Sequence, residues 1–272
     1  MGSAKHSAGG GAMRLSHAWG AETEITKHVA RIRAAPALTL LLDYDGTLVP
    51  FAPRPEMAAP DREVLQLLRR LARRRATDVH LVSGRPPRVM QSWFGAMPVG
   101  LHAEHGLWSR SLSGGEWRCR PAPPLPYDEL LGMLEWATRE TQGSLIELKS
   151  NGLAWHWRRA SVDAGRAMAD TLVGQAREWF PPQSVAVLRG DKVLEFRPAG
   201  INKGDIVTAL RREHGSGPLL VAVGDDTTDE DMFAALPVGA LSIQVGLRAK
   251  GAALRLPDVA ACRAFLERIA EA

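Results

Sequence analysis

Residues 37–47 read ALTLLLDYDGT, and this stretch decides the fold. Residues 37–42 form a short, mostly apolar run of the length that is typical of a buried strand. The run ends at Asp43, and Asp45 and Gly46 follow, so the strand delivers carboxylates at its carboxyl end. In open parallel sheets, ligands bind just outside the carboxyl ends of the strands. The stretch therefore predicts one strand of a parallel sheet with a polar site at its end.

The same pattern of an apolar run with a polar end recurs along the chain. It occurs at residues 79–82 before Ser83, 99–103 before Glu104, 219–223 before Gly224-Asp225-Asp226, and 241–245 before Gly246. Apolar residues at helical spacing lie before or between these runs, over 22–33 and 61–75. An alternation of strand, polar end and helix indicates an α/β fold with a Rossmann-like parallel sheet and helices on both faces.

The middle of the chain has a different pattern. Prolines at 121, 123, 124 and 126 break the alternation. Helices are expected over 127–141 and 162–179, and strands over 144–149, 153–158, 185–188 and 193–197. Asn151-Gly152 between two alternating runs is typical of a β-hairpin. These signals predict an inserted α+β unit with two helices and four strands.

We therefore expect three parts in the chain. Residues 1–20 are rich in Gly and Ser and are expected to be a flexible N-terminal segment. Residues 21–117 and 199–272 are expected to form the Rossmann-like core, and residues 118–198 the α+β insert.

Composition narrows the class of protein further. The 272 residues carry a net charge of +4 and are 45% hydrophobic, which excludes wholesale disorder. Apolar runs fall far short of the roughly 20 residues that span a bilayer, and no signal peptide is visible. Two cysteines are too few for a disulfide framework. Arginines scattered on expected helix faces do not indicate a nucleic-acid partner. We expect a cytoplasmic monomer that binds neither nucleic acid nor membrane.

Carboxylates gather at the predicted strand ends. Asp43 and Asp45 are two positions apart, so extended geometry points both side chains the same way. Paired carboxylates repel each other unless a cation or a shared proton intervenes. Asp225, at another strand end, would complete a set of hard oxygen ligands suited to Mg²⁺. Gly46 and Thr47 follow in a tight turn whose backbone N–H groups are expected to hold an anion.

Two further residues favour a phosphoryl group as that anion. Ser83 offers a hydroxyl donor after its strand. Lys203 opens an expected helix over 203–213, where its charge opposes the helix dipole, so its position makes sense if an anion lies there. Metal ligands, a nucleophile, hydrogen-bond donors and a cation are the parts that phosphoryl transfer needs.

The whole set resembles the haloacid dehalogenase superfamily of phosphohydrolases. Its four motifs stand in order as Asp43-Tyr44-Asp45-Gly46-Thr47, Ser83-Gly84-Arg85, Lys203, and Gly224-Asp225-Asp226-Thr227-Thr228-Asp229. Other segments are similar to trehalose-6-phosphate phosphatases: DDTTDEDMF at 225–233, AEHG at 103–106, NKG at 202–204, ELK at 147–149, HWR at 156–158 and VLEFRP at 193–198. The resemblance covers about residues 37–246. It implies that the Rossmann-like core, residues 21–117 and 199–272, is catalytic, and that the insert, residues 118–198, is a cap that sets substrate specificity.

The resemblance also implies roles in a two-step displacement that needs Mg²⁺. Asp43 attacks phosphorus and forms an aspartyl-phosphate, while Asp45 protonates the leaving oxygen and then activates water. Mg²⁺ is expected on Asp43, the Asp45 backbone carbonyl and Asp225, and Asp226 and Asp229 are expected to orient metal waters or Lys203. The phosphate contacts are expected from Gly46, Thr47, Ser83, Gly84 and Lys203. The sugar contacts are expected from Glu147, Lys149, Arg158, Lys192 and Glu195.

Other interpretations of these residues stay open. The same chemistry on another sugar phosphate, such as sucrose 6-phosphate, would use the same core with a different cap. A catalytically silent domain that only binds a sugar phosphate is a second alternative. Glu147 and Lys149 would also suit an ion pair on a solvated sheet face, although sugar contacts are favoured, and Arg85 and His105 would equally suit structural roles. Trp155 is expected in the core of the cap.

Overall fold

The computed structural model describes residues 22–215, 217–247 and 250–271, so the expected flexible segment 1–20 lies outside the described residues. These residues form two sheets, one of eight strands in the order β12-β11-β10-β1-β2-β3-β4-β5 and one of four in the order β6-β7-β9-β8. The strands of the larger sheet are β1 (Leu38–Asp43), β2 (Thr77–Val82), β3 (Gly100–Ala103), β4 (Trp108–Ser111), β5 (Gly114–Cys119), β10 (Leu219–Gly224), β11 (Leu241–Val245) and β12 (Leu254–Leu256).

β1 lies at the centre of the parallel part of this sheet. It pairs in parallel with β2 on one side and with β10 on the other, and all of its residues are buried. Helices cover both faces because neighbouring side chains of a strand point to opposite faces. Leu40 and Leu42 pack in one apolar cluster, and Leu41 packs in another. The predicted α/β class with a Rossmann-like parallel sheet is confirmed.

Six helices are described around this sheet. The first cluster packs beneath α1 (Glu22–Arg33), α2 (Arg62–Arg73), α3 (Pro87–Phe94) and α8 (Val259–Ala270), and the second beneath α6 (Gly204–His214) and α7 (Thr227–Ala235). Asp61 caps α2 by accepting a hydrogen bond from the Val64 N–H, which fixes where that helix begins. No helix among the described residues is both long and apolar enough to span a membrane.

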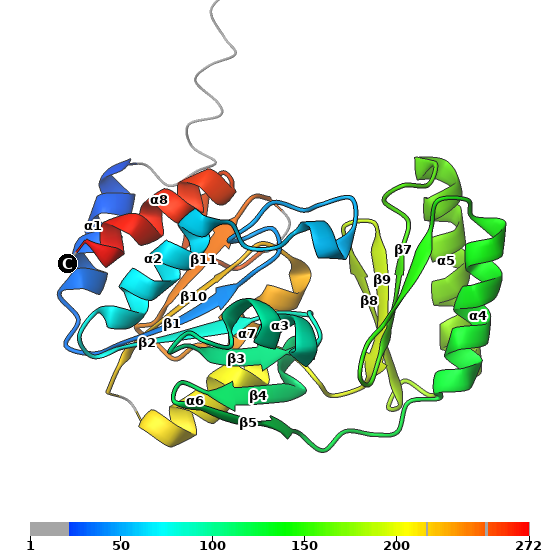
Figure 1. Cartoon of the computed structure of the whole chain (residues 1–272), viewed down its shortest axis with the longest axis horizontal. Helices are drawn as coiled ribbons and strands as arrows, with labels where there is room; N and C mark the ends of the chain where they lie inside the picture. The colour runs from blue at the N-terminus through cyan, green and yellow to red at the C-terminus, as the bar shows by residue number, and fades with distance from the viewer. Residues whose placement is uncertain (1–21, 216, 248–249, 272) are drawn as a thin grey trace, which may run out of the picture.

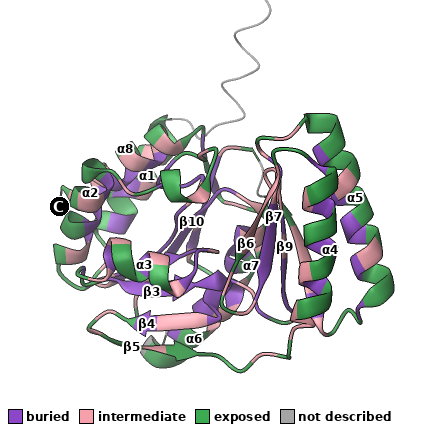
Figure 2. Ribbon diagram, turned by 45° about the vertical axis from the view of Figure 1, so that its right-hand side comes forward, coloured by how far each residue is buried: buried purple, intermediate pink, exposed green. Residues whose placement is uncertain are grey.

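The smaller sheet and its two helices, which we call the cap, lie beside the rest of the chain, which we call the core (Figure 1). The cap elements are α4 (Tyr127–Glu140), β6 (Leu145–Leu148), β7 (Leu153–His156), α5 (Val162–Trp179), β8 (Val185–Gly190) and β9 (Val193–Pro198). All strand pairs of the cap are antiparallel. The helices pack on one face of the sheet, and the other face is turned toward the core (Figure 2).

Some boundaries and elements differ from those predicted. The expected border at residues 117 and 118 falls inside β5, which continues the core sheet to Cys119. The chain passes between core and cap through residues 120–126 and 199–203. No prediction was made for α3, β12 or α8, although Asp258 caps α8 and its buried residues recur at helical spacing.

The apolar core of the cap supplies a first test. Trp155 is fully buried between the cap sheet and its helices, whereas Trp136 on α4 is 36% exposed. We expect Trp155→Ala to lower the free energy of unfolding by about 3–5 kcal/mol because it leaves a large cavity. Trp136→Ala should change it by roughly 0.5 kcal/mol or less. Chemical denaturation followed by circular dichroism compares the two, and equal losses would contradict the assignment of the cap core.

Candidate active site

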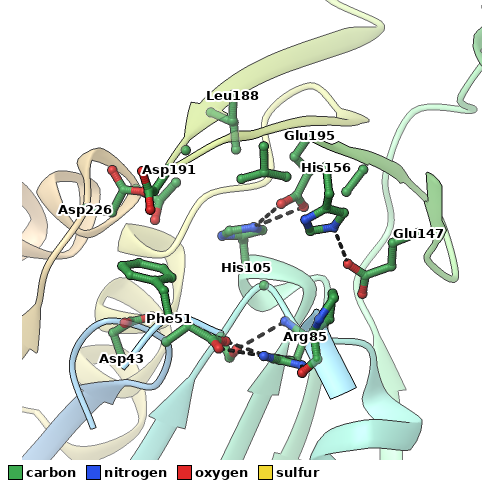
Figure 3. Close-up of a pocket in the computed structure, with 18 of the residues that line it drawn as sticks. Asp43, Phe51, Arg85, His105, Glu147, His156, Leu188, Asp191, Glu195 and Asp226 are labelled. Atoms are coloured by element: carbon green, nitrogen blue, oxygen red, sulfur yellow. Dashed lines mark hydrogen bonds and ion pairs between the residues drawn. The ribbon is translucent and has the colours of Figure 1, made fainter. Parts of the chain in front are cut away.

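Side chains from distant segments meet at the carboxyl edge of the parallel strands. Leu42 of β1 is in register with Leu81 of β2 and with Val223 of β10, so the residues that follow these strands converge. A cavity between core and cap lies at this edge (Figure 3). Its lining includes Asp43, Asp45, Ser83, Gly84, Glu147, Lys149, Arg158, Glu195, Lys203, Asp225, Asp226 and Asp229. Gly46, Thr47 and Lys192, which were also predicted as site residues, are not part of that lining.

Lys203 is a buried ammonium held by two carboxylates. Its Nζ lies 2.6 Å from Asp43 Oδ1 and 2.7 Å from Asp229 Oδ1, and the residue is 2% exposed. Burial alone would lower the pKa of Lys203, but the charges of Asp229 and Asp43 outweigh burial and raise the pKa above its usual value. A lysine at the start of α6 is thus compensated by anions, as its unfavourable place on the helix dipole predicts.

The two oxygens of Asp43 have different surroundings. Lys203 holds Oδ1, whereas Oδ2 is buried and accepts no hydrogen bond from any described residue. Burial and the charge of Asp229 raise the pKa of Asp43 above its ordinary value. A carboxylate that is oriented through one oxygen keeps lone pairs on the other for a ligand or an electrophile.

Three carboxylates lie close enough to share a cation. Asp43, Asp225 and Asp229 each offer an oxygen atom within 4.8 Å of the others. Burial, and then the charges of Asp43 and Asp229, raise the pKa of Asp225. Hard oxygen donors at this spacing suit a divalent cation such as Mg²⁺, which would relieve their repulsion.

Two glycines make this close approach possible. A Cβ atom on Gly46, whose φ is +88°, would lie 2.4 Å from Asp225 Oδ2. A Cβ atom on Gly224 would lie 2.2 Å from Asp229 Cγ. The glycines of both acidic motifs are therefore needed because a larger side chain would displace the carboxylates.

The carboxylates of Asp226 and Asp229 accept hydrogen bonds mainly from backbone N–H groups at the start of α7. Asp229 Oδ2 accepts hydrogen bonds from the N–H groups of Asp225 (2.9 Å) and Asp226 (3.1 Å), and its Oδ1 accepts from Lys203. Asp226 is the N-cap residue of the same helix, in a capping box with Asp229. This network orients Asp225 and Lys203 toward Asp43.

The side chains of Asp43 and Asp45 were expected to point the same way, and the structure separates them; the metal contact expected from the Asp45 backbone carbonyl stays a prediction. The Asp45 carboxylate is not in the acidic cluster with Asp43, because β1 ends at Asp43 and Arg85 takes the Asp45 side chain instead. Arg85 donates two hydrogen bonds to it, at 2.6 and 2.9 Å, and lies over the Trp93 ring. Arg85, for which a structural role was equally open, therefore fixes a carboxylate at the cavity.

The expected anion cradle at Gly46 and Thr47 is also wrong. The Gly46 N–H donates to Val49 O at 2.8 Å, and the Thr47 N–H points to Tyr44 O at 3.4 Å. The turn closes on its own carbonyl groups, so these amides are not free for an anion.

Ser83 and Gly84 do line the cavity, after β2. The Ser83 hydroxyl accepts a hydrogen bond from the Arg85 N–H at 3.1 Å and keeps its own proton for donation. A Cβ on Gly84 would lie 2.7 Å from His105 Nε2, so this glycine makes room for the His105 ring.

The cap contributes a row of side chains to the opposite wall. Register places Glu147 of β6, Ala154 of β7, Glu195 of β9 and Leu188 of β8 side by side, and all four line the cavity. The small Ala154 leaves space between the two carboxylates. Trp155 points to the other face, into the cap core as predicted.

The charged residues of the cap pair inside the cavity and not on a solvated face. Lys149 Nζ lies 2.7 Å from Glu195 Oε1, and His156 Nε2 lies 2.8 Å from Glu147 Oε2. The Lys149 side chain is only 5% exposed. Although burial alone would raise the pKa of Glu195, its contacts with His105 and Lys149 hold the pKa well below the usual value.

His105 joins this cap network from the core. Its Nε2 lies 3.0 Å from Glu195 Oε2. Burial lowers the pKa of His105 to about 3, so the ring is neutral at physiological pH and donates a hydrogen bond rather than a full charge.

Arg158 and the β8–β9 turn form the remaining part of the cavity wall. Arg158 Nη2 lies 2.6 Å from Asp191 Oδ2, and its guanidinium lies over the ring of Phe51, a core residue. Lys192, with a φ of +58°, lies in the turn outside the lining, and Asp191 takes that place. Phe51, His156 and Asp191 were not predicted as site residues. The apolar Phe51 just after the first acidic motif was a usable signal.

Comparison with known proteins agrees with this geometry. Residues 41–250 match the sequence model of the family described as trehalose-phosphatase. A bifunctional trehalose-6-phosphate synthase/phosphatase of Thermoproteus tenax is 38% identical over 249 residues, which are 91% of this chain and 34% of that protein. The chain thus spans about a third of the length of this curated relative.

Solved structures share the fold. The C-terminal domain of a Candida albicans trehalose-6-phosphate phosphatase superposes with a TM-score of 0.85 at 26% identity, covering 91% of this chain and 96% of that one. A haloacid dehalogenase-like hydrolase from Bacteroides thetaiotaomicron shares the fold alone, with a TM-score of 0.58 at 15% identity, covering 86% of this chain and 98% of that one.

The chain has the haloacid dehalogenase-like fold, with an acidic cluster at the carboxyl edge of its parallel strands. Within that class, the chain belongs to the trehalose-phosphatase family. The predicted family is confirmed.

The raised carboxyl pKa values predict how a cation stabilises the fold. Asp43 and Asp225 hold protons in the fold at a pH where unfolded carboxyl groups have lost them, so their stabilising contribution is largest at low pH and is lost as pH rises through their raised pKa values. A divalent cation must displace those protons. We expect 5 mM Mg²⁺ to raise the melting temperature by several degrees at pH 8 and by much less at pH 5.5.

Asp225→Asn, which removes one carboxylate, is the matched control for this effect. It should abolish most of the Mg²⁺-induced shift in melting temperature at pH 8. A shift of equal size at both pH values would show that the carboxylates are already ionised without a cation.

Proposed function

We propose that this protein is a Mg²⁺-dependent phosphatase that releases trehalose and inorganic phosphate from trehalose 6-phosphate. One observation carries the proposal. Asp43 is oriented by Lys203, no described residue donates a hydrogen bond to its Oδ2, and it lies in a cavity whose opposite wall bears the charged side chains of the cap. Phosphoryl chemistry and hydroxyl recognition then occupy opposite walls of one cavity. The substrate has the same two parts.

The first step forms a bond between Asp43 Oδ2 and phosphorus while the bond from phosphorus to the sugar oxygen breaks. Asp45, protonated and released from one of its two Arg85 hydrogen bonds, gives that proton to the departing sugar oxygen. In the second step Asp45 takes a proton from water, whose oxygen attacks phosphorus and releases phosphate and the Asp43 carboxylate. Arg85, which holds both oxygens of Asp45, sets the position of this acid and base.

Charge on the phosphoryl oxygens is met by residues of the core. Lys203 and the Ser83 hydroxyl line the cavity near Asp43 and are proposed to contact these oxygens. Because both are buried and fixed by neighbours, they need little reorganisation during the reaction. Gly84 is proposed to let the phosphoryl group approach without a side chain in the way.

The acidic cluster fits a magnesium ion. Asp43 and Asp225, together with the backbone carbonyl of Asp45, would hold it, and Asp229 would act through its bonds to Lys203 and to the backbone of Asp225. Bound there, Mg²⁺ would neutralise negative charge on the carboxylates and the phosphate.

The cap is proposed to recognise the disaccharide. Glu147, Lys149, Arg158 and Glu195 offer carboxylate acceptors and cationic donors to sugar hydroxyls, and in the structure they satisfy one another or His156 and Asp191. A sugar that cannot replace these partners leaves buried charges unpaired. This penalty makes these cap residues selective for a sugar whose hydroxyl groups match them.

Two other functions use the same fold. Another sugar phosphate, such as sucrose 6-phosphate, would need the same core and a different set of cap contacts. A silent binding domain would keep the cavity without turnover, but the intact set of Asp43, Asp45, Lys203 and Asp225 favours catalysis.

Phosphate release from a panel of substrates tests the reaction. With Mg²⁺ we expect the highest kcat/KM for trehalose 6-phosphate, ahead of sucrose 6-phosphate, glucose 6-phosphate and p-nitrophenyl phosphate, and no release in EDTA. Asp43→Asn should lower kcat by at least about 10³-fold, because the amide is a poor nucleophile, with an unchanged circular dichroism spectrum. A folded Asp43→Asn protein with full activity would overturn the nucleophile assignment.

A cap variant tests the sugar site separately from the chemistry. Glu147→Ala should lower kcat/KM for trehalose 6-phosphate by about 10–100-fold, the size expected for loss of a charged hydrogen-bond partner, and should change kcat/KM for p-nitrophenyl phosphate by less than about threefold. Glu178→Ala, an exposed acid on α5 away from the cavity, is the matched control. Equal losses on both substrates would place Glu147 in the chemistry or in folding instead.

A further inference from the structure

We propose that Glu104 is a positioning residue that holds the β6–β7 hairpin of the cap against the core, and that with His105 it fixes the sugar-binding strands over the phosphoryl site. The proposal deepens the function proposed above and rests on it for the choice of substrate. Glu104 does not line the cavity, so it would act through the residues it holds.

The backbone at this point adopts an unusual conformation. Glu104 and His105 follow β3 with φ angles of +46° and +58°, in the left-handed region that residues with a side chain seldom adopt. Two such residues in succession cost free energy and persist only where the surroundings hold them. Here the Glu104 N–H donates to Arg85 O and the His105 N–H donates to Ser83 O, each at 3.0 Å.

These backbone bonds join the pair to the phosphoryl side of the cavity. Ser83 is a proposed phosphate contact, and Arg85 holds the carboxylate of Asp45. The turn at residues 104 and 105 is thus fixed relative to the chemical groups of the core, whatever its side chains contact.

The Glu104 side chain reaches the tip of the cap hairpin. Its Oε1 accepts a hydrogen bond from the Ser150 N–H at 2.8 Å, and its Oε2 accepts from the Ser150 hydroxyl at 2.8 Å and from the Asn151 N–H at 3.4 Å. The residue is 4% exposed. Trp108 of β4 adds a hydrogen bond from Nε1 to Ser150 Oγ at 2.7 Å. A buried carboxylate that accepts three hydrogen bonds from one turn defines the position of that turn.

The hairpin tip is directly connected to the sugar site. Lys149 immediately precedes Ser150, and its N–H closes the turn onto Gly152 O at 3.0 Å. Glu147 lies two residues earlier on β6. Displacement of the turn would therefore move both proposed sugar contacts relative to Asp43.

His105 makes a second contact with the cap, on another strand. Its Nε2 meets Glu195 of β9, and Glu195 is itself paired with Lys149. Consecutive core residues thus hold β6 through Glu104 and β9 through His105. Because the chain crosses between core and cap through only two linkers, residues 120–126 and 199–203, these polar contacts decide how far the cap stands from the core.

Kinetics on two substrates tests the proposal. Glu104→Ala should raise KM for trehalose 6-phosphate at least about tenfold, with a smaller change for Glu104→Gln, which keeps one acceptor oxygen, and for Ser150→Ala. For p-nitrophenyl phosphate, which has no sugar to be held by the cap, kcat/KM should stay within about twofold. Asp170→Asn, which weakens the exposed Arg189–Asp170 ion pair within the cap, is the matched control and should change kcat/KM for neither substrate.

A distance measurement supplies a readout that does not depend on the substrate. Spin labels at Glu63→Cys on α2 and Glu135→Cys on α4, in a Cys119→Ser background, report the separation of core and cap. We expect one narrow distance distribution with Glu104 and a broader, longer one in Glu104→Ala. A wild-type protein that cleaves only p-nitrophenyl phosphate would overturn the proposed function, and the distance test would still apply.

The results that would overturn the positioning role are equally specific. An unchanged distance distribution in a folded Glu104→Ala protein, or equal losses of kcat/KM on both substrates, would show that Glu104 serves the stability of the core alone. Ser150→Ala, which removes one hydroxyl from the cap side, keeps the test valid if Glu104→Ala does not fold.

Discussion

The buried charge cluster around Lys203 is the constraint on which the rest of the structure depends. Three carboxylates lie within 4.8 Å of one another in a place that water barely reaches, and one ammonium compensates two of them. Such a group of charges is costly to bury unless each partner is held in place. Glycines at 46 and 224 provide the space, and the capping box of α7 provides amide donors for Asp229. The remaining negative charge would favour a divalent cation at this place, because a cation relieves the repulsion between the carboxylates.

In the cap, too, charged side chains pair with one another and so satisfy their hydrogen-bonding groups. The pairs are Lys149 with Glu195, Glu147 with His156, and Arg158 with Asp191. A polar ligand can bind there by replacing one member of a pair as the hydrogen-bond partner of the other. The backbone support of these pairs is an antiparallel sheet that packs its apolar face on α4 and α5 and turns its charged face to the core. A surface of this kind recognises hydroxyl groups without an apolar pocket, because each unmatched charge is penalised.

Contacts between the two parts are mostly polar. Glu104 holds the hairpin tip, His105 meets Glu195, and Arg158 lies over Phe51. Polar contacts can exchange with water at modest cost, whereas an apolar interface of the same size would lock the cap in place. The position of the cap therefore depends on a few specific contacts, among them the three hydrogen bonds that Glu104 accepts from the hairpin tip.

The sequence by itself determined the parallel sheet, the α+β insert and most of the cavity, because short apolar runs, polar strand ends and turn residues are local signals. Asp43, Asp225 and Lys203 lie at such ends and needed only the topology to meet. Tertiary structure alone decided which charges pair. Arg85 takes Asp45, the Gly46 amide is used within its own turn, and Asp191 lines the cavity where Lys192 was expected. The physical reason is that side chains pair with groups that are near them in space. These groups belong to elements far apart in the chain, and their distances cannot be read from the spacing of residues along the sequence.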